Sequence, residues 1–203
     1  VPYTLISRGD IKVIEDIILQ GDIHSDGSVR IMENASVLGN IFAEKDILLE
    51  KNATVLGNIF TQGNIIFEEG ASVIPKSQFF GCRSLEKVCL PESVSVIEDY
   101  AFADCHVLKV WESIEKLSLK SVGISAFENC YALEFASLPD SLTVIGGAAF
   151  AECVSVNKLI FSDTSLLKKI GDHAFRGCRN LKEVYLPDSV EYVGISAFRD
   201  CVS

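Results

Sequence analysis

Apolar and polar residues alternate in short runs along the first 74 residues, and the runs recur every 18 positions. The repeat is anchored by three glycines, and isoleucine lies two residues after each of them: Gly21, Gly39 and Gly57. Alternation with a period of two is typical of a β-strand that has one buried face. Three such strands per repeat predict four stacked triangular coils of a parallel β-helix, at residues 3–20, 21–38, 39–56 and 57–74.

The corners of these predicted coils carry residues that tolerate a left-handed backbone. One corner column contains Gly9, Gly27 and Gly63. A second column contains Asn34, Asn52 and Gly70. Because glycine and asparagine adopt a positive φ at less cost than other residues, we expect left-handed conformations in both columns.

A different repeat begins near residue 78, where the pattern Ala-Phe-x-x-Cys recurs every 23 or 25 positions. After a degenerate first copy at 78–82, its phenylalanines and cysteines are Phe102, Cys105, Phe127, Cys130, Phe150, Cys153, Phe175, Cys178, Phe198 and Cys201. A strand pattern, Leu-x-x-Val-x-Leu-Pro, follows the cysteines and is clearest at 85–91, 133–139 and 181–187. We expect Ala-Phe-x-x-Cys to form a short helical turn that buries the phenylalanine and the cysteine.

Both repeats have the fixed period of a solenoid, in which each unit packs only against its neighbours. The predicted fold is a mainly β solenoid. A parallel β-helix of 18-residue coils in residues 1–75 continues into repeats of 23 or 25 residues in residues 76–203. Pro75 lies at the seam, and no flexible Gly/Ser linker separates the two parts. We therefore predict an apolar core that runs through the junction.

Six of the seven cysteines occupy equivalent positions in successive repeats. Equivalent residues of stacked coils lie about 4.8 Å apart with parallel side chains, whereas a disulfide needs converging ones. We expect buried free thiols, with disulfides between some of them under oxidising conditions as the alternative. The cysteines contain no Cys-x-x-Cys pair, so a zinc site is not expected.

Composition excludes several kinds of function. The chain carries 28 acidic and 18 basic residues, a net charge of −10, and no basic stripe, so a nucleic-acid partner is not expected. No apolar run approaches the roughly 18–20 residues of a membrane span. Motifs for catalysis, metal binding or phosphate binding do not occur around the three histidines. We therefore predict a protein that is not an enzyme and that uses no cofactor or metal.

The repeat of residues 78–203 resembles the BspA-like leucine-rich repeats of bacterial and protist surface proteins. The resemblance rests on the unit Leu-x-x-Val-x-Leu-Pro-x-Ser-Val-x-x-Ile-Gly-x-x-Ala-Phe-x-x-Cys, which at least five copies keep in phase. It implies a curved solenoid with a parallel sheet along one face. It also implies a protein that adheres to host or matrix components, located outside the cell or on its surface. A cytoplasmic location is the alternative.

The 18-residue repeat resembles a different family, the bactofilins, which are polymer-forming bacterial cytoskeletal proteins. The resemblance covers about residues 3–74 and rests on the recurring pattern Ala-x-Val-x-Gly-x-Ile, present at 35–41 and 53–59. Solenoid ends also expose unpaired strand edges that invite stacking. Self-association through the solenoid ends is therefore a second expectation.

The outward positions of the leucine-rich repeat strands form the candidate binding surface. If the leucine and valine of each strand point inward, the positions five and seven residues after each repeat cysteine point outward. The binding residues predicted in this way are Lys87, Cys89, Val110, Glu112, Phe135, Ile160, Glu183 and Tyr185. Several of them are apolar or aromatic, and exposed apolar patches often mark binding sites.

Two functions follow from these patterns. The first is a non-enzymatic surface or secreted protein that binds a protein or matrix ligand through the leucine-rich repeat strands. The alternative is a structural, polymer-forming scaffold that assembles through the ends of the β-helix.

Overall fold

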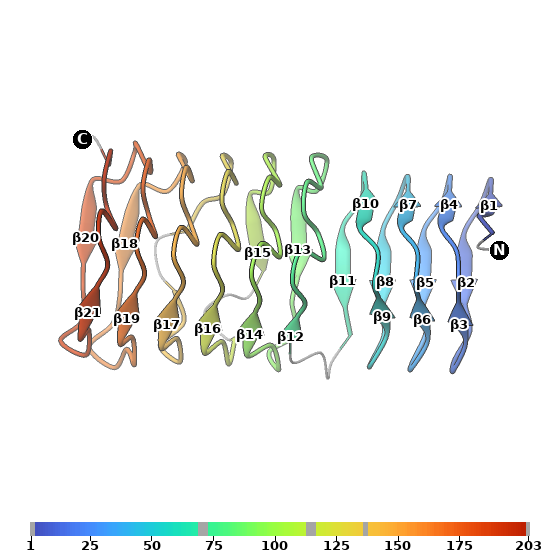
Figure 1. Ribbon diagram of the computed structural model, residues 1–203, viewed down its shortest axis with the longest axis horizontal. Helices are drawn as coiled ribbons and strands as arrows, with labels where there is room; N and C mark the ends of the chain where they lie inside the picture. Colours follow the sequence, from blue (N-terminus) through green and yellow to red (C-terminus); the bar gives the residue numbers. More distant parts are fainter. Residues whose placement is uncertain (1–2, 69–72, 113–116, 136–137, 202–203) are drawn as a thin grey trace.

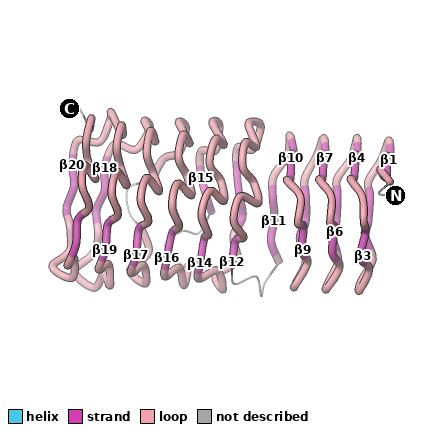
Figure 2. Tube along the Cα trace, viewed as in Figure 1, coloured by secondary structure: helices cyan, strands magenta, loops and turns pink. Residues whose placement is uncertain are grey.

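The chain forms an elongated stack of coils, each lying against the next along the long axis (Figure 1). The computed structural model describes residues 3–68, 73–112, 117–135 and 138–201. Every strand pair in these ranges is parallel and joins equivalent strands of neighbouring coils, and no helix occurs there (Figure 2). The predicted β solenoid is thereby confirmed.

The narrow coils contribute their strands to three sheets. Sheet A contains the first strand of each coil: β1 (Leu5–Ser7), β4 (Ile23–Ser25), β7 (Ile41–Ala43) and β10 (Ile59–Thr61). Sheet C contains the third strands of the first three coils: β3 (Ile18–Leu19), β6 (Ser36–Val37) and β9 (Thr54–Val55). Sheet B contains the second strands and extends into the wider coils: β2 (Ile11–Val13), β5 (Val29–Ile31), β8 (Ile47–Leu49), β11 (Ile65–Phe67), β13 (Lys87–Cys89) and β15 (Val110–Glu112).

Two further sheets belong mainly to the wider coils. Sheet D begins with the last strand of the narrow coils and follows the repeats to the end of the stack. Its strands are β12 (Val73–Ile74), β14 (Val96–Ile97), β16 (Ser121–Val122), β17 (Val144–Ile145), β19 (Lys169–Ile170) and β21 (Tyr192–Val193). Sheet E is a single pair: β18 (Lys158–Ile160) and β20 (Glu183–Tyr185).

The stack stays in register where the coil size changes. Strand β11 pairs with β13, so that Ile65 lies opposite Val88, and β12 pairs with β14. A single cluster of buried apolar residues extends from Ile11 to Ala197. The predicted continuity of the core through the junction is therefore confirmed.

A ladder of phenylalanine rings fills the core of the wider coils. Successive rings lie nearly parallel, and their centroids are 5.0 to 5.4 Å apart. All but the last ring are almost completely buried: Phe79, Phe102, Phe127, Phe150 and Phe175. The four middle rings, Phe102, Phe127, Phe150 and Phe175, therefore stack on a neighbouring phenylalanine on each face.

The Ala-Phe-x-x-Cys segments are turns, and the expectation of helical turns is wrong. In one of them the amides of Phe102 and Asp104 donate to the carbonyls of the next coil, at 2.8 and 2.9 Å. The amides of the residues in between donate to the carbonyl three residues earlier in the same turn, as the Cys105 amide does to the Phe102 carbonyl at 3.3 Å. Tyr100, just before the segment, and Asp104, within it, have φ values of 56° and 61°. These left-handed residues stop the helical path on both sides of the phenylalanine.

The repeat cysteines are free thiols, as the sequence predicts. Each thiol of the series from Cys105 to Cys201 donates to the carbonyl of the phenylalanine one repeat earlier, at 3.1 to 3.2 Å. Burial raises the pKa of the Cys130, Cys153 and Cys178 thiols, because the charged thiolate would lose its hydration. These side chains therefore stay protonated at neutral pH and act as buried hydrogen-bond donors.

The two corner columns adopt different backbone conformations. Asn34 and Asn52 are left-handed, with φ values of 58° and 57°, whereas Gly70 lies outside the described residues. The expectation for the column of Gly9, Gly27 and Gly63 is wrong, because none of these three has a positive φ. A Cβ on Gly27 would lie 2.7 Å from the amide nitrogen of the coil below. In the stacked coils, glycine is therefore needed for the close approach of two backbones.

The phenylalanine ladder predicts a large effect of a single truncation. Phe127→Ala removes a ring that is stacked on both faces, so we expect it to lower the free energy of unfolding by about 3–5 kcal/mol. Phe80→Ala is the matched control, because that ring is 42% exposed, and we expect a change within about 0.5 kcal/mol. Urea denaturation of both variants measures the difference. Equal loss of stability in the two variants would contradict the ladder as the main source of core stability.

Candidate functional site

Seven of the eight predicted binding residues lie on paired strands of the wider coils, and they fall into two groups. The first group lies where β13 pairs with β15, which places Lys87 opposite Val110 and Cys89 opposite Glu112. The side chains of Lys87 and Cys89 are half-buried. In β13, Val88 is buried between these two half-buried side chains, and the pairing with β15 aligns the backbone positions in the two strands.

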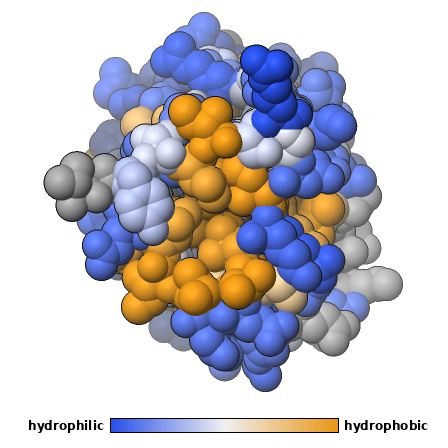
Figure 3. All heavy atoms as spheres, turned by 90° about the vertical axis from the view of Figure 1, so that its right-hand side faces the viewer, coloured by the Kyte–Doolittle hydropathy of each residue, from blue (hydrophilic) through white to orange (hydrophobic). Residues whose placement is uncertain are grey.

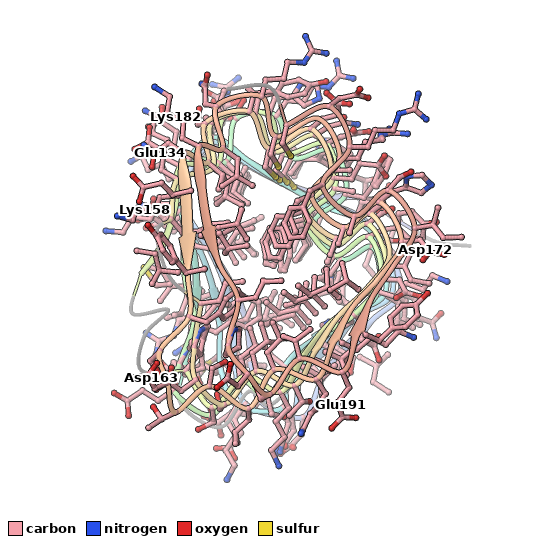
Figure 4. All side chains as sticks on the ribbon, turned by 90° about the vertical axis from the view of Figure 1, so that its left-hand side faces the viewer. Glu134, Lys158, Asp163, Asp172, Lys182 and Glu191 are labelled. Carbon is pink, nitrogen blue, oxygen red and sulfur yellow. The ribbon has the colours of Figure 1, made fainter. Side chains whose placement is uncertain are left out.

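The second group lies on sheet E, near the C-terminal end of the stack. Ile160 on β18 lies opposite Tyr185 on β20, and the Tyr185 side chain is 59% exposed. Beside them, Lys158 forms an ion pair with Glu183 at 2.8 Å. Figure 4 views the stack from this end and shows Lys158 on the outer side of the sheet, with the aromatic rings in the interior.

The charges of Lys158 and Glu183 in this second group stabilise each other. A hydrogen bond from Lys158 to Glu183, together with the negative charge of that carboxylate, raises the pKa of Lys158. Both side chains are open to solvent, so the pair contributes little to stability. Its effect is to hold two opposite charges in a defined place next to an exposed aromatic ring.

Phe135 does not join this face, which corrects the sequence expectation. Its ring is half-buried and packs edge-on against Phe150, with centroids 5.2 Å apart. Phe135 belongs to none of the described strands, and its repeat lies between the last strand of sheet B and the first strand of sheet E. Without strand geometry to direct it outward, the ring turns toward the apolar core. The outer face is therefore not one continuous apolar strip.

Sequence reasoning missed a groove on the outer side of sheet A at the seam. It is a groove of about 350 Å³ whose lining includes His24, Phe42 and Phe60, and residues 81–84 of the first wide coil. The three rings stand three positions after the repeat glycines, so the 18-residue alignment already places them in one outward column. The groove itself depends on the step between a narrow and a wide coil, which neither repeat reveals alone.

The N-terminal end of the stack carries an apolar surface (Figure 3). Strands β1, β2 and β3 are the outermost strands of sheets A, B and C, so each has one edge that no described strand pairs with. Large side chains are exposed in this first coil, including Ile6 at 75%, Ile14 at 59% and Ile18 at 64%. This end therefore combines open backbone edges with apolar side chains.

The described residues contain neither a cluster of metal ligands nor a Cys–His dyad at Cys105 and His106. No group of three or more His, Cys, Asp or Glu side chains within the described ranges could hold a metal ion. Cys105 and His106 do not form a dyad, because the thiol donates to the carbonyl of Phe79 while the imidazole stacks on Tyr131. None of the described residues forms a helix with the length and hydropathy to cross a bilayer.

Solved structures with the same kind of fold agree with this geometry. The chain is similar to a leucine-rich repeat protein of T. pallidum, with 27% identity, a TM-score of 0.54, and coverage of 77% of this chain and 81% of that one. It is also similar in fold to a leucine-rich repeat protein from Eubacterium ventriosum, with 12% identity and a TM-score of 0.54, over 91% of this chain and 72% of that one. No curated protein matches the chain significantly.

The family comparison supports one of the two resemblances expected from the sequence and does not support the other. The family described as "BspA type Leucine rich repeat region" matches in six copies, over residues 53–165 and 112–203. The match begins inside the narrow coils, so it crosses the seam. The comparisons give no support to the bactofilin resemblance of residues 3–74. By this match over most of its length, the chain belongs to the family of proteins with BspA-type leucine-rich repeats.

Proposed function

We propose that the protein is a non-enzymatic binding protein that contacts a protein or matrix ligand through the outer face of its leucine-rich repeat strands. The repeat family supports a role in protein–protein interaction. The observation that carries the proposal is the exposed ring of Tyr185, which lies beside Ile160 and the Lys158–Glu183 ion pair. Interfaces commonly combine an aromatic anchor with a polar rim.

We place this protein outside the cell or on its surface, where a protein or matrix ligand would be available. The resemblance to the repeats of surface proteins supports this location, and a cytoplasmic location is the alternative. Adhesion to host or matrix components is the finer role that follows from a surface location.

Removal of the aromatic anchor tests the proposed face. Tyr185→Ala is expected to weaken binding to a responsive matrix protein by roughly 30-fold, because truncating an interface anchor commonly costs about 2 kcal/mol. Surface plasmon resonance against a panel of immobilised extracellular-matrix proteins measures the change. Ile160→Ala should weaken the same interaction to a smaller extent.

Tyr192→Ala provides the matched control, because Tyr192 is 47% exposed in the same last coil but belongs to sheet D. We expect this variant to bind like the unmodified chain. If Tyr192→Ala weakened binding as much as Tyr185→Ala, or if neither variant changed it, the proposed face would be wrong.

A structural scaffold that assembles through the ends of the stack is a second candidate function. It is favoured by the apolar first coil with its open strand edges, and by the 18-residue coils that resemble those of bactofilins. Sedimentation velocity should then show concentration-dependent growth that Ile6→Lys together with Ile18→Lys abolishes. A monomer at every concentration would exclude assembly through this end.

A further inference from the structure

The groove at the seam has two chemically different walls and one closed end. One wall is the stack of His24, Phe42 and Phe60, whose neighbouring centroids are 4.4 and 5.0 Å apart. The polar side chains that line it two positions further along each coil are Asp26, Glu44 and Gln62. Residues 81–84 close the groove because the wider coils extend beyond the edge of β10 (Figure 1). Its volume of about 350 Å³ suits a small or narrow ligand.

Backbone amides along the groove already donate hydrogen bonds to the neighbouring coil. The amides of Asp26, Glu44 and Gln62 donate to carbonyls of the preceding coil at 3.0 to 3.2 Å. The groove lies on the face of sheet A, and β10 is the last strand of that sheet. The outer edge of β10 is next to residues 81–84, where the Cys82 thiol donates to the carbonyl of Ile59. On the face of the sheet, a ligand meets the side chains of the three coils.

The charges that line the groove are mixed. Asp26 and Glu44 contribute carboxylates, and Glu44 accepts a hydrogen bond from the Gln62 amide at 2.6 Å. Arg83 contributes an exposed guanidinium at the closed end. A strongly cationic ligand would meet this arginine, and a strongly anionic one would meet the carboxylates. The lining suits a neutral ligand whose groups can both donate and accept hydrogen bonds, as hydroxyls do.

We infer that the seam groove is a binding site for a neutral linear oligosaccharide. Sugar hydroxyls would donate to the carboxylates of Asp26 and Glu44 and accept from the guanidinium of Arg83. The apolar C–H groups of the sugar rings would pack against the aromatic wall. Three coils span about 10 Å from the first ring to the last, which accommodates a short segment of a sugar chain along the solenoid axis. This site is independent of the protein-binding face proposed above.

Isothermal titration calorimetry with the full chain tests the inference. The probes are cellohexaose, maltohexaose, mannohexaose and hexa-N-acetylchitohexaose, four neutral chains that differ in linkage and shape. We expect at least one to bind, and Asp26→Ala and Arg83→Ala each to weaken that binding about tenfold by removing a hydrogen bond to a charged group. Both side chains are exposed, so the variants should fold normally, and circular dichroism with thermal melting checks this.

Asp163→Ala is the matched control, because Asp163 is an exposed aspartate in the wider coils and does not line the groove. It should bind the responding sugar with unchanged affinity. The inference is overturned if none of the four sugars binds at millimolar concentration. It is also overturned if Asp26→Ala and Arg83→Ala both leave sugar binding unchanged. Binding of hexalysine that Asp26→Ala abolishes, with no binding of any sugar, would likewise overturn it and would indicate a site for cations.

Discussion

In-register stacking is the constraint on which the rest of this structure depends. Parallel pairing places each residue beside its counterpart in the next coil, as Ile23, Ile41 and Ile59 show in sheet A. With strands about 4.8 Å apart, each side chain of a sheet packs against the side chain at the equivalent position of the next coil, and in the core these are mostly alike. Phenylalanines meet this requirement by stacking their rings, and asparagines by amide contacts, as between Asn52 and Asn34 at 3.0 Å. The repeating sequence is the consequence of this geometry.

Periodicity was sufficient to predict the solenoid, the buried columns and the free thiols, because each depends on neighbouring coils alone. It was not sufficient where a residue leaves the repeating geometry. Phe135 belongs to none of the described strands, and its ring packs inward against Phe150 instead of facing solvent. Glycine columns were also ambiguous, because Gly27 is required by a close backbone approach and not by a positive φ. Composition alone does not distinguish these two reasons for a glycine.

Two places in such a stack can bind a partner: a face where aligned side chains are exposed to solvent, and a seam where the coil size changes. The outer face of sheet E presents aligned side chains that could contact a large partner, with Tyr185 as its exposed ring. The seam presents a different kind of surface, because a narrow coil meets a wide one and leaves a groove beside Phe60. The second surface could not be predicted from either repeat, since it arises only where the two cross-sections meet. Both surfaces require the coils to stay in register through the junction.

Amide hydrogen exchange across the seam tests that requirement most directly. The amide of Glu98 donates to the carbonyl of Ile74 at 2.9 Å, which joins the first wide coil to the last narrow one. We expect this amide to be protected to the same degree as that of Gly146, which makes the equivalent bond at 2.8 Å between two wide coils. Rapid exchange at Glu98, with protection kept in the coils on both sides, would contradict a continuous in-register stack.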